Sequence, residues 1–400
     1  MKSCLDQLGP IPSSGLGFLY FSTAFAPHAG SIATLARRLT GIDDWVGAGS
    51  DAVMAVGPRG PEVLGPEVSV DGAGSGPGVA MMILALPADS HRLIRLSPES
   101  PGGTPEPGLF DWMQSAGKPS AMFHADQPSR AAVQAAGSLR AVCGDIPGSA
   151  EPLALVGATV GDGAGPGAAR PQICGVVAEG GATGVLFAGA ARGISGLAQG
   201  CAPIGPVRWV SDADGGVVSG LDGHSARAAF HQDIGDLLAR DPQRTQGFVF
   251  AGLIRGRNGS PAGRACNGQV IEPGDYAVAS IVDPGGWPGG CQDAIRLTTD
   301  PAPGDGIVFV RRDQASAIAA LDRMVDRLIR RAGRAHIRAA HLITCGDRAT
   351  SIFGNPGIDF MRIADRLGPV PMIGFQADTP IMGETLYSRA AVLTLWTDNS

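Results

Sequence analysis

One pattern of apolar residues occurs near the start of the chain and again near its end. In the first copy, an apolar run at 16–21 precedes a helical stripe of Ile32, Leu35 and Leu39, and a second run starts at Trp45. Short apolar runs are typical of buried strands, whereas a spacing of three to four residues indicates one face of a helix. The pattern therefore predicts a strand, a helix and a second strand that ends in glycines.

The second copy has the same order of elements. His341 to Cys345 is the predicted strand, Phe360, Ala364 and Leu367 form the helical stripe, and "VPMIGFQAD" is the second strand. A partial third copy runs from "GVLFAGAARGISG" to "LAQGCAPIGPV" but has no helical stripe. The recurrence predicts two related halves, each built from a sheet and helices.

Composition favours a folded protein of the α/β class. Of the 400 residues, 44% are hydrophobic and 17% are charged, which is the opposite of a disordered composition. The 60 glycines and 31 prolines lie between apolar runs without a Gly-X-Y period, as expected for many turns. Residues 255–305 alternate short apolar pieces with turn residues and predict a small antiparallel insert. The predicted fold class is therefore α/β, with α+β as the alternative.

Charge and motif content exclude several classes of partner. The net charge of −6 is spread along the chain, so it provides no basic excess for nucleic acid. The arginines of the predicted helix at 313–331 alternate with Asp322 and Asp326, which indicates a solvated face. The longest apolar stretch, 79–87, is too short to cross a bilayer, and no secretory signal begins the chain. We expect a cytoplasmic protein without membrane insertion.

The common signatures of catalysis and metal binding are missing from the sequence. Seven cysteines without a C-x-x-C pair predict free thiols and no zinc site. "GDGAGPG" at 161–167 follows no apolar strand closely, so we interpret it as a linker rather than a dinucleotide loop. The seven histidines are dispersed. One of them could hold haem iron, because an axial imidazole needs no sequence spacing, but the sequence does not single one out.

Two cysteine motifs lie where strands are predicted to end. "QGCAPIGP" places Cys201 between Gly200 and Pro203, and "TCGDR" places Cys345 three residues before Arg348. Binding crevices of α/β folds lie at such strand ends, and an arginine favours a thiolate nearby. A small apolar packing role explains both cysteines as well, so a nucleophilic role stays open.

In order along the chain, these segments resemble the FIST proteins, a prokaryotic family with an N-terminal and a C-terminal FIST domain. The N-terminal half carries "LGFLYFS", "VGAGSDAV" and a glycine-cysteine-x-proline-x-glycine signature at 200–205. In the C-terminal half, Cys345, Arg348, Gly374 and Phe375 occupy the family's places. The chain departs from the family in the residues around Arg348, and Pro380 stands where the family has a glutamate. The resemblance predicts a FIST N-terminal domain at 14–218 and a FIST C-terminal domain at 219–390.

The resemblance implies a cytoplasmic sensory protein rather than an enzyme. It would bind a small molecule such as an amino acid and pass a signal to a separate protein, for example a histidine kinase. One branch of the family is a haem-binding nitric oxide sensor, so haem is an alternative cofactor. An enzyme that uses Cys345 as its nucleophile is a further alternative, which would need a base near the sulfur.

The predicted ligand site combines strand ends from both halves, and Arg348 is its polar anchor because guanidinium binds carboxylates bidentately. The predicted site residues are Gly47, Gly200, Cys201, Pro203, Gly205, Cys345, Arg348, Gly374 and Phe375.

Overall fold

A computed structural model of the chain divides into two compact units. The first comprises Met1–Leu197 and Leu321–Ser400, and the second comprises Ala198–Ala320. The residues that the structure describes are 2–58, 60–65, 76–96, 109, 111–112, 120–126, 132, 134–139, 154–161, 170–178, 180–188, 191, 193–235, 245, 247–255, 276–282, 293–333, 336–355 and 357–397. The predicted linker at 161–167 therefore lies almost wholly outside the described residues.

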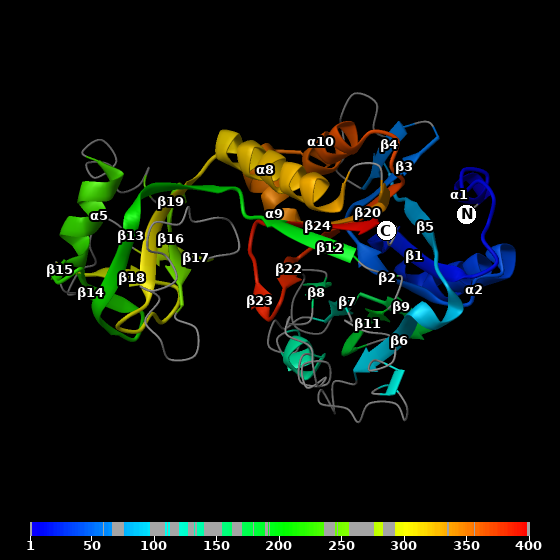
Figure 1. The fold of residues 1–400 in the computed structure, drawn as a ribbon, viewed down its shortest axis with the longest axis horizontal. Coiled ribbons are helices and arrows are strands. Elements are labelled where there is room, and N and C mark those ends of the chain that lie inside the picture. Colours follow the sequence, from blue (N-terminus) through cyan, green and yellow to red (C-terminus); the bar gives the residue numbers. More distant parts are fainter. Residues whose placement is uncertain are drawn as a thin grey trace. The chain divides into compact units, whose positions relative to one another are not determined.

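Three mixed sheets form the first unit (Figure 1). In order across each sheet, the first contains β10 (Val176–Ala178), β9 (Gln172–Cys174), β2 (Trp45–Ser50), β1 (Gly15–Ser22) and β5 (Val79–Ala85). The second contains β23 (Thr385–Leu386), β22 (Thr379–Met382), β8 (Ala154–Thr159), β7 (Ser120–Ala125), β11 (Ala182–Phe187) and β6 (His91–Leu96). The third contains β12 (Gly193–Ala198), β24 (Ala391–Thr397), β20 (Ile337–Cys345), β21 (Met372–Ala377), β3 (Val53–Gly57) and β4 (Gly60–Leu64).

Both full copies of the sequence pattern form strand-helix-strand units, which confirms the α/β class. β1 and β2 pair in parallel and are joined through α2 (Ala29–Thr40), and β20 and β21 pair in parallel and are joined through α10 (Ile358–Leu367). Gly41 follows the last residue of α2 and Gly368 that of α10, and both have positive φ, where glycine has no Cβ penalty. The predicted stripe of α2 is only partly right, since Leu35 and Leu39 are exposed and alanines fill the buried face beside Ile32.

A further parallel pair was not predicted. β7 and β8 pair in parallel in the second sheet, and the intervening chain is helical at 134–139, where Ala135, Ala136 and Leu139 are buried. The partial third copy is wrong as a repeat, because β11 and β12 belong to different sheets and β11 is antiparallel to both neighbours.

The second unit contains an antiparallel barrel. Its strands are β13 (Cys201–Asp214), β19 (Gly306–Arg312), β16 (Val249–Ile254), β17 (Ala277–Val282), β18 (Ile295–Leu297) and β14 (Val217–Leu221), and β13 pairs again with β14, which closes the ring. β15 (His224–Ser225) pairs antiparallel with β14. α5 (Ala226–Ile234) buries Phe230 against Phe309, with ring centroids 4.9 Å apart. The predicted antiparallel insert at 255–305 is thus corrected: β17 and β18 are two strands of a larger barrel.

The compact units do not follow the predicted domain boundary between 218 and 219. The first unit takes strands from both ends of the chain, because β3 near the N-terminus pairs with β21 near the C-terminus. The domains at 14–218 and 219–390, drawn from the family resemblance, stay a prediction.

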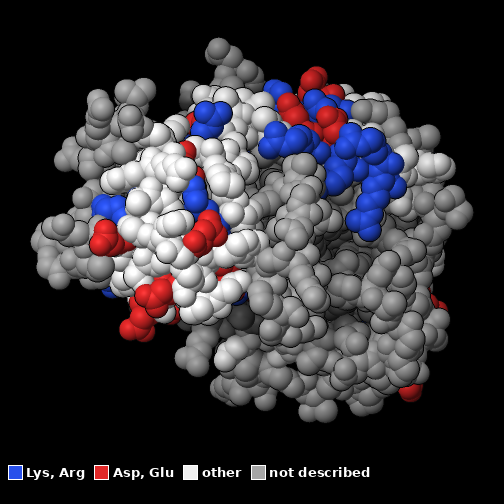
Figure 2. Space-filling model, turned by 60° about the vertical axis from the view of Figure 1, so that its left-hand side comes forward, with Lys and Arg blue, Asp and Glu red and all other residues white. Residues whose placement is uncertain are grey.

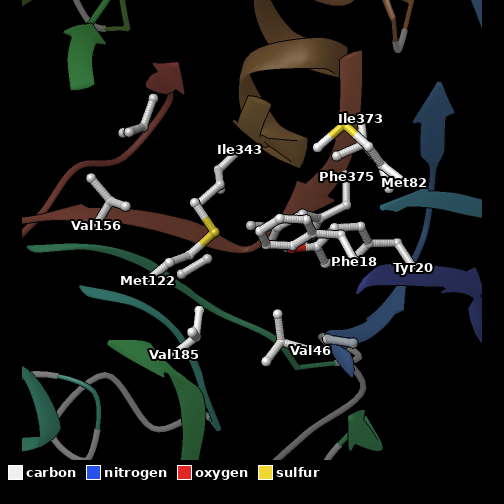
Figure 3. Close-up of a cluster of buried hydrophobic side chains, with 14 of the residues drawn as sticks. Phe18, Tyr20, Val46, Met82, Met122, Val156, Val185, Ile343, Ile373 and Phe375 are labelled. Atoms are coloured by element: carbon white, nitrogen blue, oxygen red, sulfur yellow. The ribbon is translucent and has the colours of Figure 1, made fainter. Parts of the chain in front are cut away.

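A hydrophobic core of the first unit lies where its three sheets meet. Figure 3 shows Phe18 and Tyr20 from β1 beside Phe375 from β21, with Met122 and Ile343 close by. The ring of Tyr20 stacks on Phe375 at 4.3 Å between centroids. Aliphatic and aromatic side chains from segments more than 300 residues apart in the sequence thus form one core.

The charged surface has no single sign. α8 (Gln314–Ala332) carries arginines and aspartates, and Arg362 and Arg366 of α10 form ion pairs with Asp322 and Asp326. Figure 2 shows one face of the molecule, on which basic side chains gather beside acidic ones. Among the described residues, no helix combines the length and apolar character needed to span a membrane.

Candidate functional site

The predicted anchor Arg348 lies in a buried ion pair. It ends α9 (Gly346–Arg348), directly after β20, and it has no solvent-exposed surface. Its Nε donates to Asp359 Oδ2 at 2.7 Å, and its Nη2 donates to Asp359 Oδ1 at 3.0 Å. The Thr344 hydroxyl donates to the same carboxylate at 3.1 Å. The pair connects the end of β20 to the first turn of α10, so the fold itself explains this charge, and a role of Arg348 in ligand binding stays a prediction.

Cys345 is buried at the end of β20. Its Sγ donates to the backbone oxygen of Asp378 at 2.9 Å. Burial raises the pKa of the Cys345 thiol above its ordinary value. A catalytic cysteine needs a stabilised thiolate, so this environment is that of a packed, hydrogen-bonded thiol and not of an activated nucleophile.

The other predicted residues of the first unit are parts of the packed sheets. A Cβ built on Gly47 of β2 would lie 1.8 Å from the Leu19 backbone oxygen, which explains why glycine is needed there. Gly374 lies in β21 beside Leu342 of β20, and Phe375 is fully buried against Tyr20. These residues therefore hold strands close together.

The glycine-cysteine-proline-glycine signature lies in the second unit, at the start of the barrel. Gly200 has a φ of +71°, and Cys201 begins β13, whose register against β19 shifts between Pro203 and Val207. Arg312 Nε donates to Cys201 Sγ at 3.3 Å, and Gly205 allows close approach of Asp233. The signature marks an irregular strand that helps to close the barrel. The residues of the signature and those around Cys345 belong to different units, so each set is described separately and a joint ligand site stays a prediction.

A buried polar cluster, which the sequence did not single out, lies inside the first core. The Tyr20 hydroxyl is 3.0 Å from His124 Nε2 and 2.7 Å from His341 Nε2, and all three residues are fully buried. A hydroxyl has one proton, so it donates to one imidazole and accepts from the other. Burial lowers the pKa of each histidine to about 3, which keeps both rings neutral.

A cavity of about 740 Å³ lies at the edge of the first sheet, also within the first unit. One wall is β5, the outermost strand of its sheet, and another is the β3–β4 hairpin. The N-terminal segment, which contributes residues between Cys4 in α1 (Lys2–Leu5) and Pro12, and residues Pro369 to Met372 complete the lining. Cys4 Sγ donates to the Val79 backbone oxygen at 3.3 Å, which attaches the N-terminal segment to β5.

The lining of this cavity is predominantly apolar. Leu8, Ile11, Leu64, Met81 and Met372 contribute to it, and the polar side chains are those of Gln7 and Glu62. No lysine, arginine or histidine is among the described residues that line it. Small-molecule sites are commonly apolar clefts of roughly 300–1,000 Å³ with few polar groups, and this cavity has both properties. None of the nine residues predicted from sequence lines it.

One sequence signal could have pointed to the cavity. A Gly-Pro-aliphatic-Pro motif occurs at 9–12 and again at 368–371, shortly before β1 and β21. The three residues after the glycine line the cavity in both copies. Proline fixes φ and donates no backbone hydrogen bond, so both segments lie outside the strands, although the Pro371 oxygen accepts from the Ala340 amide of β20.

The histidines near the core do not fit axial coordination of haem. His124 and His341 each use Nε2 for Tyr20 and lie in the packed core, and the described lining of the cavity has no histidine. No group of three or more potential metal ligands occurs among the described residues. These two histidines therefore do not support the haem alternative, which stays a prediction.

The fold and the cavity together define an α/β protein with a predominantly apolar cavity of the size of small-molecule sites and no recognisable catalytic constellation among its described residues. The FIST N domain matches residues 15–224, more than half of the chain, so the protein belongs to the FIST family. The match confirms the resemblance for this half, while a C-terminal FIST domain stays a prediction.

Two relatives are uncharacterised mycobacterial proteins, one from Mycobacterium bovis and one from Mycobacterium tuberculosis. Each is 28% identical to this chain over 262 residues, which is 64% of this chain. The aligned region spans 62% of the length of these relatives. They are therefore similar over much, but not all, of their length.

Proposed function

We propose that this FIST protein is a sensor that binds a small, predominantly apolar ligand in the cavity beside β5 and signals to a separate protein. The observation that carries the proposal is the cavity itself, whose volume of about 740 Å³ lies in the range of ligand sites. Membership of a family associated with sensing and signal transduction supports the same conclusion.

The chemistry of the lining favours some ligands over others. The carboxylate of a free amino acid needs a cationic or multiple hydrogen-bonding partner when it is buried, and the only charged side chain in the described lining is Glu62. A neutral ligand with a large apolar surface meets no such penalty. We therefore propose a neutral apolar ligand in place of the free amino acid that the family resemblance suggested.

The N-terminal segment provides a route from the ligand to a partner. It forms one wall of the cavity, and Ile11 within it is also 40% exposed. A ligand that contacts the inner side of the N-terminal segment favours one conformation of this segment over others. The surface that the segment presents to a partner then changes. A signalling protein such as a histidine kinase is the kind of partner we propose.

Binding of N-phenyl-1-naphthylamine tests the proposal. This neutral probe fluoresces in apolar surroundings, and we expect saturable binding with a stoichiometry of one. Ala55→Trp should remove this binding. Ala55 lines the cavity and is half-buried, so an indole at this position would occupy the cavity and exclude the probe.

Val176→Trp is the matched control. Val176 is 50% exposed on β10 and does not line the cavity, so the same side chain added there should leave probe binding unchanged. A thermal unfolding curve for each variant establishes that it is folded. Saturable binding that persists in folded Ala55→Trp would show that the probe binds elsewhere, and the cavity would then not be the ligand site.

A further inference from the structure

The outer edge of β5 provides the cavity with backbone groups as well as side chains. β5 is the last strand of its sheet and pairs only with β1 among the described strands. Residues 79–83 of this strand line the cavity. An open strand edge carries a row of N–H and C=O groups that can pair with another extended chain.

The register shows which backbone groups point into the cavity. In an antiparallel pair, opposite residues alternate between those that exchange hydrogen bonds and those that do not. The Ser22 amide donates to the Gly78 oxygen at 2.9 Å, so these two opposite residues form a hydrogen-bonded pair. The register is regular, so the pairs Tyr20–Ala80 and Phe18–Met82, each two residues further along, are also hydrogen-bonded pairs. The intervening residues of β5 therefore direct their backbone groups away from β1.

Those outward residues are Val79, Met81 and Ile83. The Val79 oxygen already accepts from Cys4 Sγ, which confirms the outward direction. The outward amides and carbonyls of Met81 and Ile83 have no hydrogen-bond partner within the described part of the chain. Two residues thus offer two donors and two acceptors, spaced by about 6.8 Å at roughly 3.4 Å per residue.

We propose that the ligand is a short, uncharged, extended peptide that adds to β5 as a further strand. This inference rests on the proposed function and specifies its ligand. Backbone pairing with Met81 and Ile83 provides the polar contacts, and Leu8, Leu64 and Met372 contact alternate apolar side chains. The cavity volume of about 740 Å³ favours a short peptide over a segment of a folded partner. Glu62 disfavours a free carboxylate, so the termini are capped or neutral.

Methylation of single amide nitrogens in the peptide tests strand addition. The probe is acetyl-Val-Leu-Val-amide, measured by displacement of N-phenyl-1-naphthylamine. In a strand, alternate amides point to the same side, so N-methylation should weaken displacement at least about tenfold at alternate positions and less than about threefold at the others. A uniform effect at all three positions would overturn the proposal, because it would indicate simple filling of an apolar space.

The control arms separate this inference from the proposed function. If the fluorescent probe binds but the tripeptide does not displace it, strand addition is wrong and the apolar ligand site remains. If the probe itself does not bind, the proposed function fails first. A longer peptide with the same three residues between Gly-Ser flanks should displace the probe at least tenfold less well, and equal displacement would contradict a short ligand.

A proline substitution tests the same contact from the side of the protein. Ile83→Pro removes an outward N–H and leaves the hydrogen bonds to β1 intact, and proline is tolerated at such edge positions. Ile83→Ala removes the same side chain but keeps the N–H. We expect the proline variant to lose at least about fivefold in peptide affinity relative to the alanine variant, with each affinity corrected for that variant's own affinity for the fluorescent probe. Equal peptide affinities in the two folded variants would contradict the proposal, and the methylation series decides if the proline variant does not fold.

Discussion

Replacement of Arg348 by methionine separates a structural role of this arginine from a role in ligand binding. Arg348 has no exposed surface, and its partner Asp359 is 3% exposed. Removal of Arg348 leaves a buried carboxylate that keeps, within the described part of the chain, the hydrogen bond from Thr344. Loss of one partner of a buried ion pair typically costs about 3–5 kcal/mol, because the other charge stays desolvated. We therefore expect a loss of about 3 kcal/mol or more in the free energy of opening of α10.

Native-state hydrogen exchange measured by mass spectrometry is the suitable assay, because a chain of two units need not unfold in one step. A loss of about 3 kcal/mol corresponds to exchange that is at least about a hundredfold faster, since 1.36 kcal/mol is a factor of ten. Peptides from α10 should show this acceleration, whereas peptides from α5 in the other unit are the internal control.

A double variant refines the test of Arg348. In Arg348→Met with Asp359→Leu, both charges are replaced by apolar side chains, and most of the protection should return. Unchanged exchange of α10 in Arg348→Met would refute the structural role of the ion pair.

The buried polar cluster leads to two further predictions. Tyr20→Phe leaves the Nε2 atoms of His124 and His341 without their common partner, so we expect a loss of about 2–4 kcal/mol in the free energy of opening of β1, measured by native-state hydrogen exchange. A loss below about 0.5 kcal/mol would contradict the hydrogen-bond assignment. The pKa of each histidine is lowered to about 3 in the folded protein, so between pH 6.5 and about 3 the unfolded state binds more protons than the folded state. Stability should therefore fall as pH falls through this window, by up to about 1.4 kcal/mol per pH unit for each histidine. His124→Phe should reduce this slope in thermal melts at several pH values, and a slope equal to that of the unmodified protein would exclude this residue as its source.

The parts of the fold that the sequence predicts are those with strong local patterns. The two strand-helix-strand units were predicted because their apolar residues follow one another within about 30 residues and glycines end their helices. The barrel was not predicted, because β13 contains Pro203 and Pro206 and pairs with β19 about 100 residues later along the chain. Pairing between such distant strands leaves no local periodicity.

The candidate site was harder to predict than the fold. Arg348 stood out as a charge beside a strand end, but its partner Asp359 lies 11 residues later, on a helix whose orientation only the structure shows. The cavity arises because the N-terminal segment crosses β5, more than 70 residues away in the sequence. A cavity formed by distant segments has no sequence motif of its own, although two Gly-Pro-aliphatic-Pro segments contribute to the lining of this one.

β5 links the proposed ligand site to the buried polar cluster. Its outward backbone groups face the cavity, while its alternate residues are paired to β1, where Ala80 lies opposite Tyr20 and Met82 opposite Phe18. Met82 also lines the cavity and belongs to the same core as both rings. A strand added to β5 would therefore restrict β5 and, through the β1 ladder, the backbone that holds the Tyr20 hydroxyl between two histidines. Because the Tyr20 hydroxyl bonds both imidazoles only while β1 holds it between them, we expect a shift of β5 on ligand binding to be felt at this cluster.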